Sequence, residues 1–218
     1  SIYEVPILMQ KEGLDKIVLK KLGLDFSSDV QLKNWKKFLK EIQNPKKEVT
    51  IGLVGKYIEL KDAYKSITEA IIHAGSENSC KVNIDWIDAE TINDNNAAIK
   101  INNLCGIIVA PGFGDRGLEG KISAIKYIRE NNIPFLGICL GMQSAVIEFS
   151  RNVLGLKDAN STEMNPKTSA PVISLINEQK NITEKGGTMR LGAYDCYLNN
   201  ESNAFRAYKK NNISERHR

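Results

Sequence analysis

Hydrophobic and polar positions follow two alternating periods along the chain from residue 49 onward. Apolar runs typical of buried strands occupy residues 49–55, 105–111 and 133–139, and residues 82–87 alternate as a half-buried strand. Between these runs, apolar residues recur at helical spacing. Strands that alternate with helices predict an α/β fold: a doubly wound, mostly parallel sheet with helices on both faces. Ligands of such sheets bind beyond the carboxyl ends of the strands.

Two helices are predicted between the strands. Asp62 is expected to cap a helix whose apolar face runs to residue 74, and Gly75 is expected to end it. The apolar face of a later helix carries Ile122, Ile125 and Ile128. Both helices would pack one apolar side against the sheet.

The two ends of the chain differ from this pattern. Residues 1–48 hold two short Lys-rich helical patterns, around residues 14–22 and 32–42, which indicate a helical arm or interdomain connector followed by a main domain at 49–218. Residues 157–170 are polar and lack a period, so they predict a long loop. Beyond it, residues 172–176 and 188–198 predict strands joined through Gly186 and Gly187.

Composition narrows the functional classes. The formal net charge is +4 and basic residues occur in no run longer than a pair, which disfavours a nucleic-acid partner. Four cysteines are widely spaced without a C-x-x-C pair, so we expect a reduced, cytoplasmic protein without a metal site. No apolar stretch has the length of a membrane span, so we expect no membrane partner.

The segment GICLGMQ, residues 137–143, is the strongest candidate for chemistry. It places Cys139 between Gly137 and Gly141, where an apolar strand passes into a helical stretch. A sharp strand-to-helix turn needs glycine on both sides and exposes the residue at its top. The first N–H groups of the following helix favour a thiolate there. We therefore favour a nucleophile over a small buried hydrophobe at Cys139.

A second glycine cluster completes this hypothesis. Neighbouring strand ends converge in a doubly wound sheet, so the N–H of Gly112 is expected to face the carbonyl that Cys139 attacks, and the N–H of Leu140 would supply the other half of an oxyanion hole. Gly112, Gly114 and Gly117 also spell the dinucleotide pattern G-x-G-x-x-G, but the next strand ends in Cys139 instead of the acidic residue that binds ribose. We reject the dinucleotide interpretation.

A catalytic base is harder to find, because the chain contains only two histidines. His73 lies late in a predicted helix, where a residue of the helix face is expected. His217 is flanked by Arg216 and Arg218, which indicates a basic cluster. The catalytic set therefore looks incomplete. A cysteine hydrolase and a regulatory module without catalysis, both on the same fold, stay open as alternatives.

Several segments together resemble one enzyme family. They are SIYEVP (1–6), GKYIELKDAYKSITEA (55–70), PGFGDRGLEGKI (111–122), NNIPFLGICLGMQ (131–143), NSTEM (160–164), GGTMRLGAYDC (186–196) and SERHR (214–218). GICLGMQ is similar to the class I glutamine amidotransferases. The other segments are similar to the C-terminal glutaminase part of the CTP synthase family. The resemblance spans essentially the whole chain.

The resemblance implies a role for each matching residue. Cys139 would be the nucleophile that hydrolyses glutamine through a thioester. Glutamine-binding positions would be Gly112, Phe113, Leu140, Gly141, Met142, Gln143 and Glu163. Glu163 is suited to pair with the α-ammonium of glutamine, since a carboxylate and an ammonium form a charge-assisted hydrogen bond.

The resemblance also implies partners outside this chain. The ammonia would pass to an N-terminal synthetase domain that uses ATP and Mg to aminate UTP to CTP, with GTP as activator of the glutaminase. No cofactor is expected within the glutaminase domain itself. The full-length enzyme would be a homotetramer.

The chain departs from the family pattern in three places. Where the family often has Pro-Gly-Gly before its Phe, this chain has Ala110, Pro111 and Gly112, so the first glycine is lost while Gly112 survives. Residues 177–185 look short, so some contacts to GTP are expected to be missing. The catalytic His and Glu of the family come from a segment beyond SERHR. We therefore expect this stretch of chain to lack its base and to hydrolyse little glutamine alone.

Overall fold

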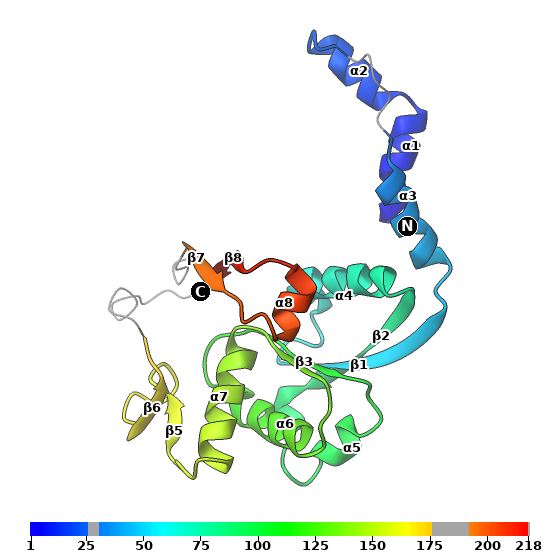
Figure 1. Cartoon of the computed structure of the whole chain (residues 1–218). Coiled ribbons are helices and arrows are strands. Elements are labelled where there is room, and N and C mark those ends of the chain that lie inside the picture. Colours follow the sequence, from blue (N-terminus) through cyan, green and yellow to red (C-terminus); the bar gives the residue numbers. More distant parts are fainter. Residues whose placement is uncertain (26–30, 176–191, 218) are drawn as a thin grey trace. The chain divides into compact units, whose positions relative to one another are not determined.

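The computed structural model describes residues 1–25, 31–175 and 192–217 (Figure 1). Internal contacts divide the chain into two compact units. The first unit comprises Ser1–Ile51 and Leu60–Asp85, and the second comprises Gly52–Glu59 and Trp86–Arg218. The expected division into an arm at 1–48 and a main domain at 49–218 stays a prediction. Each unit is described by itself below.

The first unit is mostly helical. Its elements are η1 (Ile2–Glu4), α1 (Val5–Lys11), α2 (Leu14–Lys21), α3 (Lys33–Gln43), η2 (Lys61–Tyr64) and α4 (Lys65–Glu77), with the first parts of β1 (Lys47–Gly55) and β2 (Cys80–Asp88). α2 and α3 confirm the two Lys-rich helices. α3 packs on α4, where the ring of Phe38 lies 4.9 Å from that of His73 and 5.1 Å from that of Tyr3. His73 therefore belongs to an aromatic cluster, in keeping with a helix-face residue.

The predicted limits of the helix at 62–74 were wrong. Residues Lys61–Tyr64 form a 3₁₀ turn, Tyr64 is the N-cap of α4 without a side-chain cap, and the helix continues to Glu77. Gly75 lies inside α4. A Cβ at this position would lie 2.5 Å from the carbonyl oxygen of Cys80. This glycine therefore serves a close approach of helix and strand, and does not end the helix.

The second unit holds the rest of the sheet and its helices. Its elements are η3 (Ala89–Thr91), α5 (Ala97–Ile101), β3 (Ile107–Val109), α6 (Leu118–Glu130), β4 (Phe135–Gly137), α7 (Leu140–Asn152), β5 (Ala159–Ser161), β6 (Ala170–Ile173), β7 (Gly192–Tyr197), α8 (Asn203–Tyr208) and β8 (Asn212–His217). The central sheet has the order β2-β1-β3-β4. β3 pairs in parallel with β1, Gly52 opposite Ile107, and with β4, Ile107 opposite Phe135. These pairings confirm the predicted parallel α/β sheet.

Two apolar clusters bury the sheet and helices of this unit. The first joins Val54 and Val109 of the sheet to Ile125 and Ile128 of α6. The second joins Ile122 of α6 to α7. The predicted apolar face of residues 122–128 is therefore confirmed. Within the described residues, no helix is long and apolar enough to cross a membrane.

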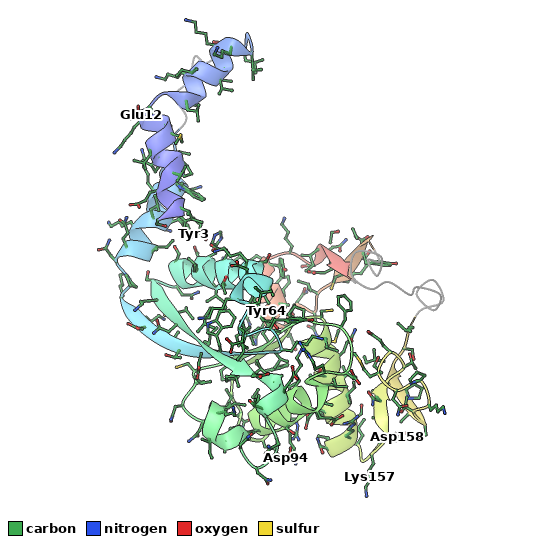
Figure 2. All side chains as sticks on the ribbon, turned by 180° about the vertical axis from the view of Figure 1, so that it is seen from behind. Tyr3, Glu12, Tyr64, Asp94, Lys157 and Asp158 are labelled. Carbon is green, nitrogen blue, oxygen red and sulfur yellow. The ribbon has the colours of Figure 1, made fainter. Side chains whose placement is uncertain are left out.

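The long loop expected at 157–170 proved partly wrong, because β5 lies within it and pairs in parallel with β6. Asp158, labelled in Figure 2, follows α7. Its carboxylate accepts hydrogen bonds from the backbone N–H and the hydroxyl of Ser169, at 2.6 and 2.8 Å. Polar hydrogen bonds hold this segment in place, and a search for apolar periodicity does not detect them. β7 lies within the strand predicted at 188–198, while Gly186, Gly187 and the segment 177–185 lie outside the described residues.

Candidate active site

Cys139 lies at the turn between β4 and α7. Its backbone has φ 53° and ψ −110°, outside the common allowed regions for a non-glycine residue. Both flanking glycines are required by close approaches: a Cβ on Gly137 would lie 2.6 Å from the amide nitrogen of Met142, and a Cβ on Gly141 would lie 2.1 Å from the carbonyl oxygen of Val109. The predicted strained strand-to-helix turn is therefore present.

Hydrogen bonds fix this turn to the carboxyl end of the sheet. The N–H of Ile138 donates to the carbonyl of Val109 at 3.0 Å, which ties the end of β4 to the end of β3. The N–H of Gly141 donates to Ile138 at 2.9 Å, and the N–H of Gln143 donates to Cys139 at 3.0 Å. Cys139 is held by backbone bonds on both sides, so its strained conformation is over-determined by its surroundings.

Gly112 and Leu140, the two residues expected to form an oxyanion hole, lie side by side. The position of a Cβ on Gly112 is 3.6 Å from Cδ2 of Leu140. Leu140 is the first residue of α7, so its N–H has no partner four residues earlier in that helix. The structure thus brings the Gly112 backbone, the start of α7 and Cys139 to the same sheet edge.

Two lysines that sequence reasoning did not single out also reach this edge. Lys56, at the end of β1, donates from its ammonium to the carbonyl of Phe113. Lys121 on α6 is fully buried, and its ammonium donates to the carbonyl of Ala110 at 2.8 Å. Both bonds hold the backbone on either side of Gly112. A signal for Lys121 was available, since it lies three residues after the buried Leu118 on the apolar stripe of its helix.

Burial dominates the electrostatics of Lys121. The loss of hydration, and next the positive charge of Lys56, lower the pKa of Lys121 to about 8, while a negative charge on Cys139 acts in the opposite direction. An ammonium with this pKa changes its charge near neutral pH. The site can therefore carry a variable positive charge beside the thiol.

The remaining predicted glutamine-binding residues lie on the first turn of α7, next to Gly112 and after β5. Met142 is exposed on the first turn of α7, and Gln143 and Phe113 are half-buried. Glu163 is half-buried between β5 and β6, and its N–H donates to the hydroxyl of Ser161 at 3.2 Å. The next residue, Met164, packs against the apolar cluster that contains Leu140. The binding roles of these residues stay predictions.

A family model described as "Glutamine amidotransferase class-I" matches residues 59–218. The chain belongs to this family. The match covers the strained turn at Cys139, the Gly112 backbone and Glu163, so the features built above lie within the amidotransferase domain. It agrees with the fold class expected from the sequence.

Curated relatives that are similar in sequence over the whole chain are named CTP synthase. A CTP synthase of Flavobacterium johnsoniae is 60% identical over 218 residues, which are 100% of this chain and 41% of that protein. A CTP synthase of Methanocaldococcus jannaschii is 56% identical over 224 aligned residues, again 100% of this chain and 41% of that protein. The chain thus spans about two fifths of the length of these curated relatives.

The chain is also similar in fold to a solved structure. It is the glutaminase domain of Trypanosoma brucei CTPS with bound acivicin, which is 38% identical. The likeness has a TM-score of 0.70 and covers 78% of this chain and 66% of that chain. The fold and the sequence are therefore similar to a glutaminase domain of that enzyme.

Proposed function

We propose that this chain is the glutaminase part of a CTP synthase and hydrolyses glutamine through a thioester on Cys139. The observation that carries the proposal is the backbone of Cys139, held at φ 53° on the turn between β4 and α7. A nucleophile at the top of such a turn, with a backbone oxyanion site beside it, suits attack on a carbonyl carbon.

Glutamine would bind with its side-chain amide at Cys139 and its α-carbon toward Glu163. The carboxylate of Glu163 would accept hydrogen bonds from the α-ammonium, which fixes one end of the substrate. Phe113, Gly141, Met142 and Gln143 would border the amide end. In this pose the reacting carbon would lie over the thiol.

The reaction then has two halves. The thiolate of Cys139 attacks the amide carbon, a carbon–sulfur bond forms, and the carbonyl oxygen takes the negative charge. The N–H groups of Gly112 and Leu140 would donate to this oxygen. The carbon–nitrogen bond breaks, the nitrogen takes a proton and leaves as ammonia, and water then cleaves the thioester to glutamate and free thiol. The proton transfers would be carried by a His and a Glu of the family, and no residue of this chain is assigned that role.

The partners in this proposal follow from the likeness to longer proteins named CTP synthase. The ammonia would pass to a synthetase domain that uses ATP and Mg to convert UTP to CTP, and GTP would activate the glutaminase. No cofactor is assigned to the chain itself. The homotetramer and the cytoplasmic location stay predictions.

Covalent labelling tests the proposal without requiring turnover. A glutamine analogue with an electrophilic side chain should label Cys139, located by peptide mass spectrometry, and glutamine should slow the labelling. Cys105→Ser is the matched control, because Cys105 is an exposed thiol away from the turn, and this variant should label like the parent. If the analogue failed to label Cys139 while simple esters were cleaved, the chain would be a cysteine hydrolase instead.

A further inference from the structure

Lys121 is a buried cation without a carboxylate partner among the described residues. Its side chain is completely buried, and its ammonium donates to one neutral group, the Ala110 carbonyl, at 2.8 Å. The ionisable groups that act on it within that part of the chain are Lys56 and Cys139. Removing an ammonium from water costs several kcal/mol unless an opposite charge compensates it. A nearby negative charge would offset the cost of burying this ammonium.

The Cys139 thiolate is the negative charge that this position can meet. The ammonium of Lys121 lies 3.8 Å from where a Cβ of Gly112 would stand, and Gly112 contacts Leu140, the residue after Cys139. Ala110, which accepts the hydrogen bond of Lys121, lies two residues before Gly112. Lys121 therefore contacts the Ala110–Gly112 backbone, and a negative charge on Cys139 acts on its ammonium.

We propose that Lys121 is the positioning residue of this site: its ammonium is the counter-charge of the Cys139 thiolate and holds the Ala110–Gly112 backbone in place. This inference rests on the proposed function only in taking Cys139 as the reacting thiol. When the thiol ionises, its proton passes to water, and the resulting ion pair removes the cost of a lone buried cation. A negative charge on Cys139 raises the pKa of Lys121, so an ionised thiol favours the charged form of the ammonium.

The pH dependence of Cys139 alkylation measures this coupling directly. Iodoacetamide reacts with the thiolate: a sulfur–carbon bond forms, the carbon–iodine bond breaks and iodide leaves. The rate at Cys139 is followed by peptide mass spectrometry from about pH 6 to about pH 9.5 in the complete chain. Variants are Lys121→Met, which is similar in length and uncharged, and Lys121→Arg, which keeps the charge.

The variants should separate charge from packing. Lys121→Met should raise the midpoint of the pH profile by about one unit, and so slow the reaction about tenfold below the midpoint. Lys121→Arg should stay closer to the parent. Lys126→Met is the matched control, since Lys126 lies on the same helix but pairs with Asp94 at the surface, and it should leave the profile unchanged. An unchanged profile in folded Lys121→Met would overturn the inference.

A second measurement leaves Lys121 in place and so does not depend on the folding of its variants. In the carbon-13 NMR titration of the lysine side chains, replacing Cys139 by Ala should lower the pKa of Lys121, because coupling between two titrating groups is reciprocal. No shift would overturn the inference while leaving the proposed function intact. Failure of the glutamine analogue to label Cys139 would instead remove the proposed function.

Discussion

Gly141 packs so tightly on Val109 that a Cβ on the glycine would lie 2.1 Å from the carbonyl oxygen of the valine. The same carbonyl accepts the N–H of Ile138 at 3.0 Å. The start of α7 is thereby seated on the end of β3, and Cys139 lies between these two contacts. The position of Cys139 is set by contact of backbone with backbone, which no side-chain rearrangement can relieve.

Gly141→Ala should therefore destabilise the protein strongly. The added methyl group meets a strand backbone, so the helix must shift, and we expect a loss of about 3 kcal/mol or more in the free energy of unfolding. Gly155→Ala is the control, because Gly155 has φ 74° and no atom within 4 Å of a Cβ, so only its left-handed backbone is strained, at about 1 kcal/mol. Urea denaturation followed by circular dichroism measures both. Equal losses would contradict the packing argument.

The strain at Cys139 predicts that glycine is more stable than alanine at this position. Cys139→Gly should be more stable than Cys139→Ala by about 1 kcal/mol. Glycine adopts positive φ without the cost of about 1–2 kcal/mol that a residue with a side chain has there. The greater conformational entropy of glycine in the unfolded chain offsets part of this advantage. Both variants should lose labelling by the glutamine analogue. Equal stability of the two in thermal or urea unfolding would show that the turn carries no strain.

The sequence predicted the strand-to-helix turn at Cys139, because glycines flank that residue where an apolar run passes into a helical pattern. Gly137 and Gly141 are needed by contacts within a few residues of Cys139 or with the neighbouring strand, and an apolar run followed by a helical pattern identifies such a turn. The parallel sheet was equally accessible, since the alternating periods report burial.

Features that depend on distant partners could not be predicted in this way. The Gly75 backbone meets the Cys80 carbonyl, so a glycine typical of a helix end lies inside a helix. The carboxylate of Asp158 accepts a hydrogen bond from the backbone N–H of Ser169, and hydrophobic periodicity does not reveal a polar contact of this kind. The binding positions that the resemblance gave, Glu163 among them, remain predictions.

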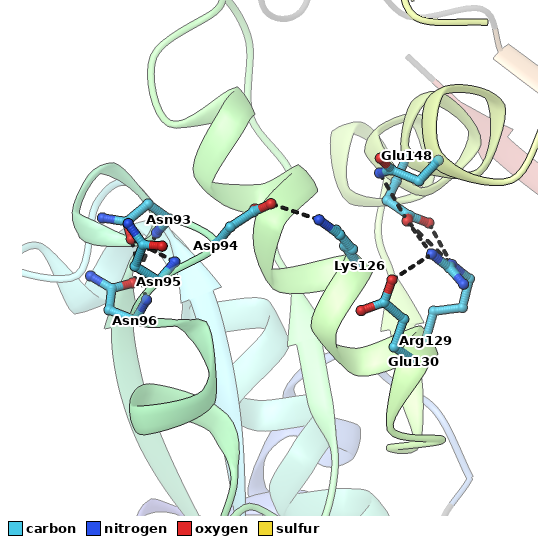
Figure 3. Close-up of polar contacts among 9 residues, drawn as sticks. Asn93, Asp94, Asn95, Asn96, Lys126, Arg129, Glu130 and Glu148 are labelled. Carbon is cyan, nitrogen blue, oxygen red and sulfur yellow. Dashed lines mark hydrogen bonds and ion pairs between the residues drawn. The ribbon is translucent and has the colours of Figure 1, made fainter. Parts of the chain in front are cut away.

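The ion pair between the buried Glu148 and the partly exposed Arg129 predicts a large effect on stability (Figure 3). Glu148 is 1% exposed and accepts hydrogen bonds from Nε and Nη2 of Arg129, at 3.0 and 2.8 Å. Arg129→Met leaves a buried carboxylate without its cation, so we expect a loss of about 2–4 kcal/mol in the free energy of unfolding. Glu148→Leu in the same chain should restore much of it.

The neighbouring pair of Lys126 and Asp94, at 2.7 Å, is the control for this experiment because it lies at the surface (Figure 3). Removing an exposed partner should cost less than about 1 kcal/mol. A double-mutant cycle by urea denaturation gives each coupling energy. Similar small couplings for both pairs would show that Glu148 is hydrated in solution.

Lys121 predicts an unusual dependence of stability on pH. Its pKa is about 8 in the folded protein, against an ordinary value of 10.5, so between these values the unfolded chain binds more protons than the folded one. Stability must then rise with pH across this window, by about 2 kcal/mol from about pH 7.5 to about pH 10. Lys121→Met lacks this contribution, so its stability relative to the parent should fall by the same amount over that range. Lys126→Met is the control: its hydrogen bond to Asp94 raises the pKa of Lys126 above the ordinary 10.5, so its contribution changes only above this window and the variant should stay parallel to the parent. Urea denaturation in a Cys139→Ala background removes the titration of the thiol, and stability curves of parent and Lys121→Met that stay parallel across the window would show that Lys121 titrates at its ordinary pH.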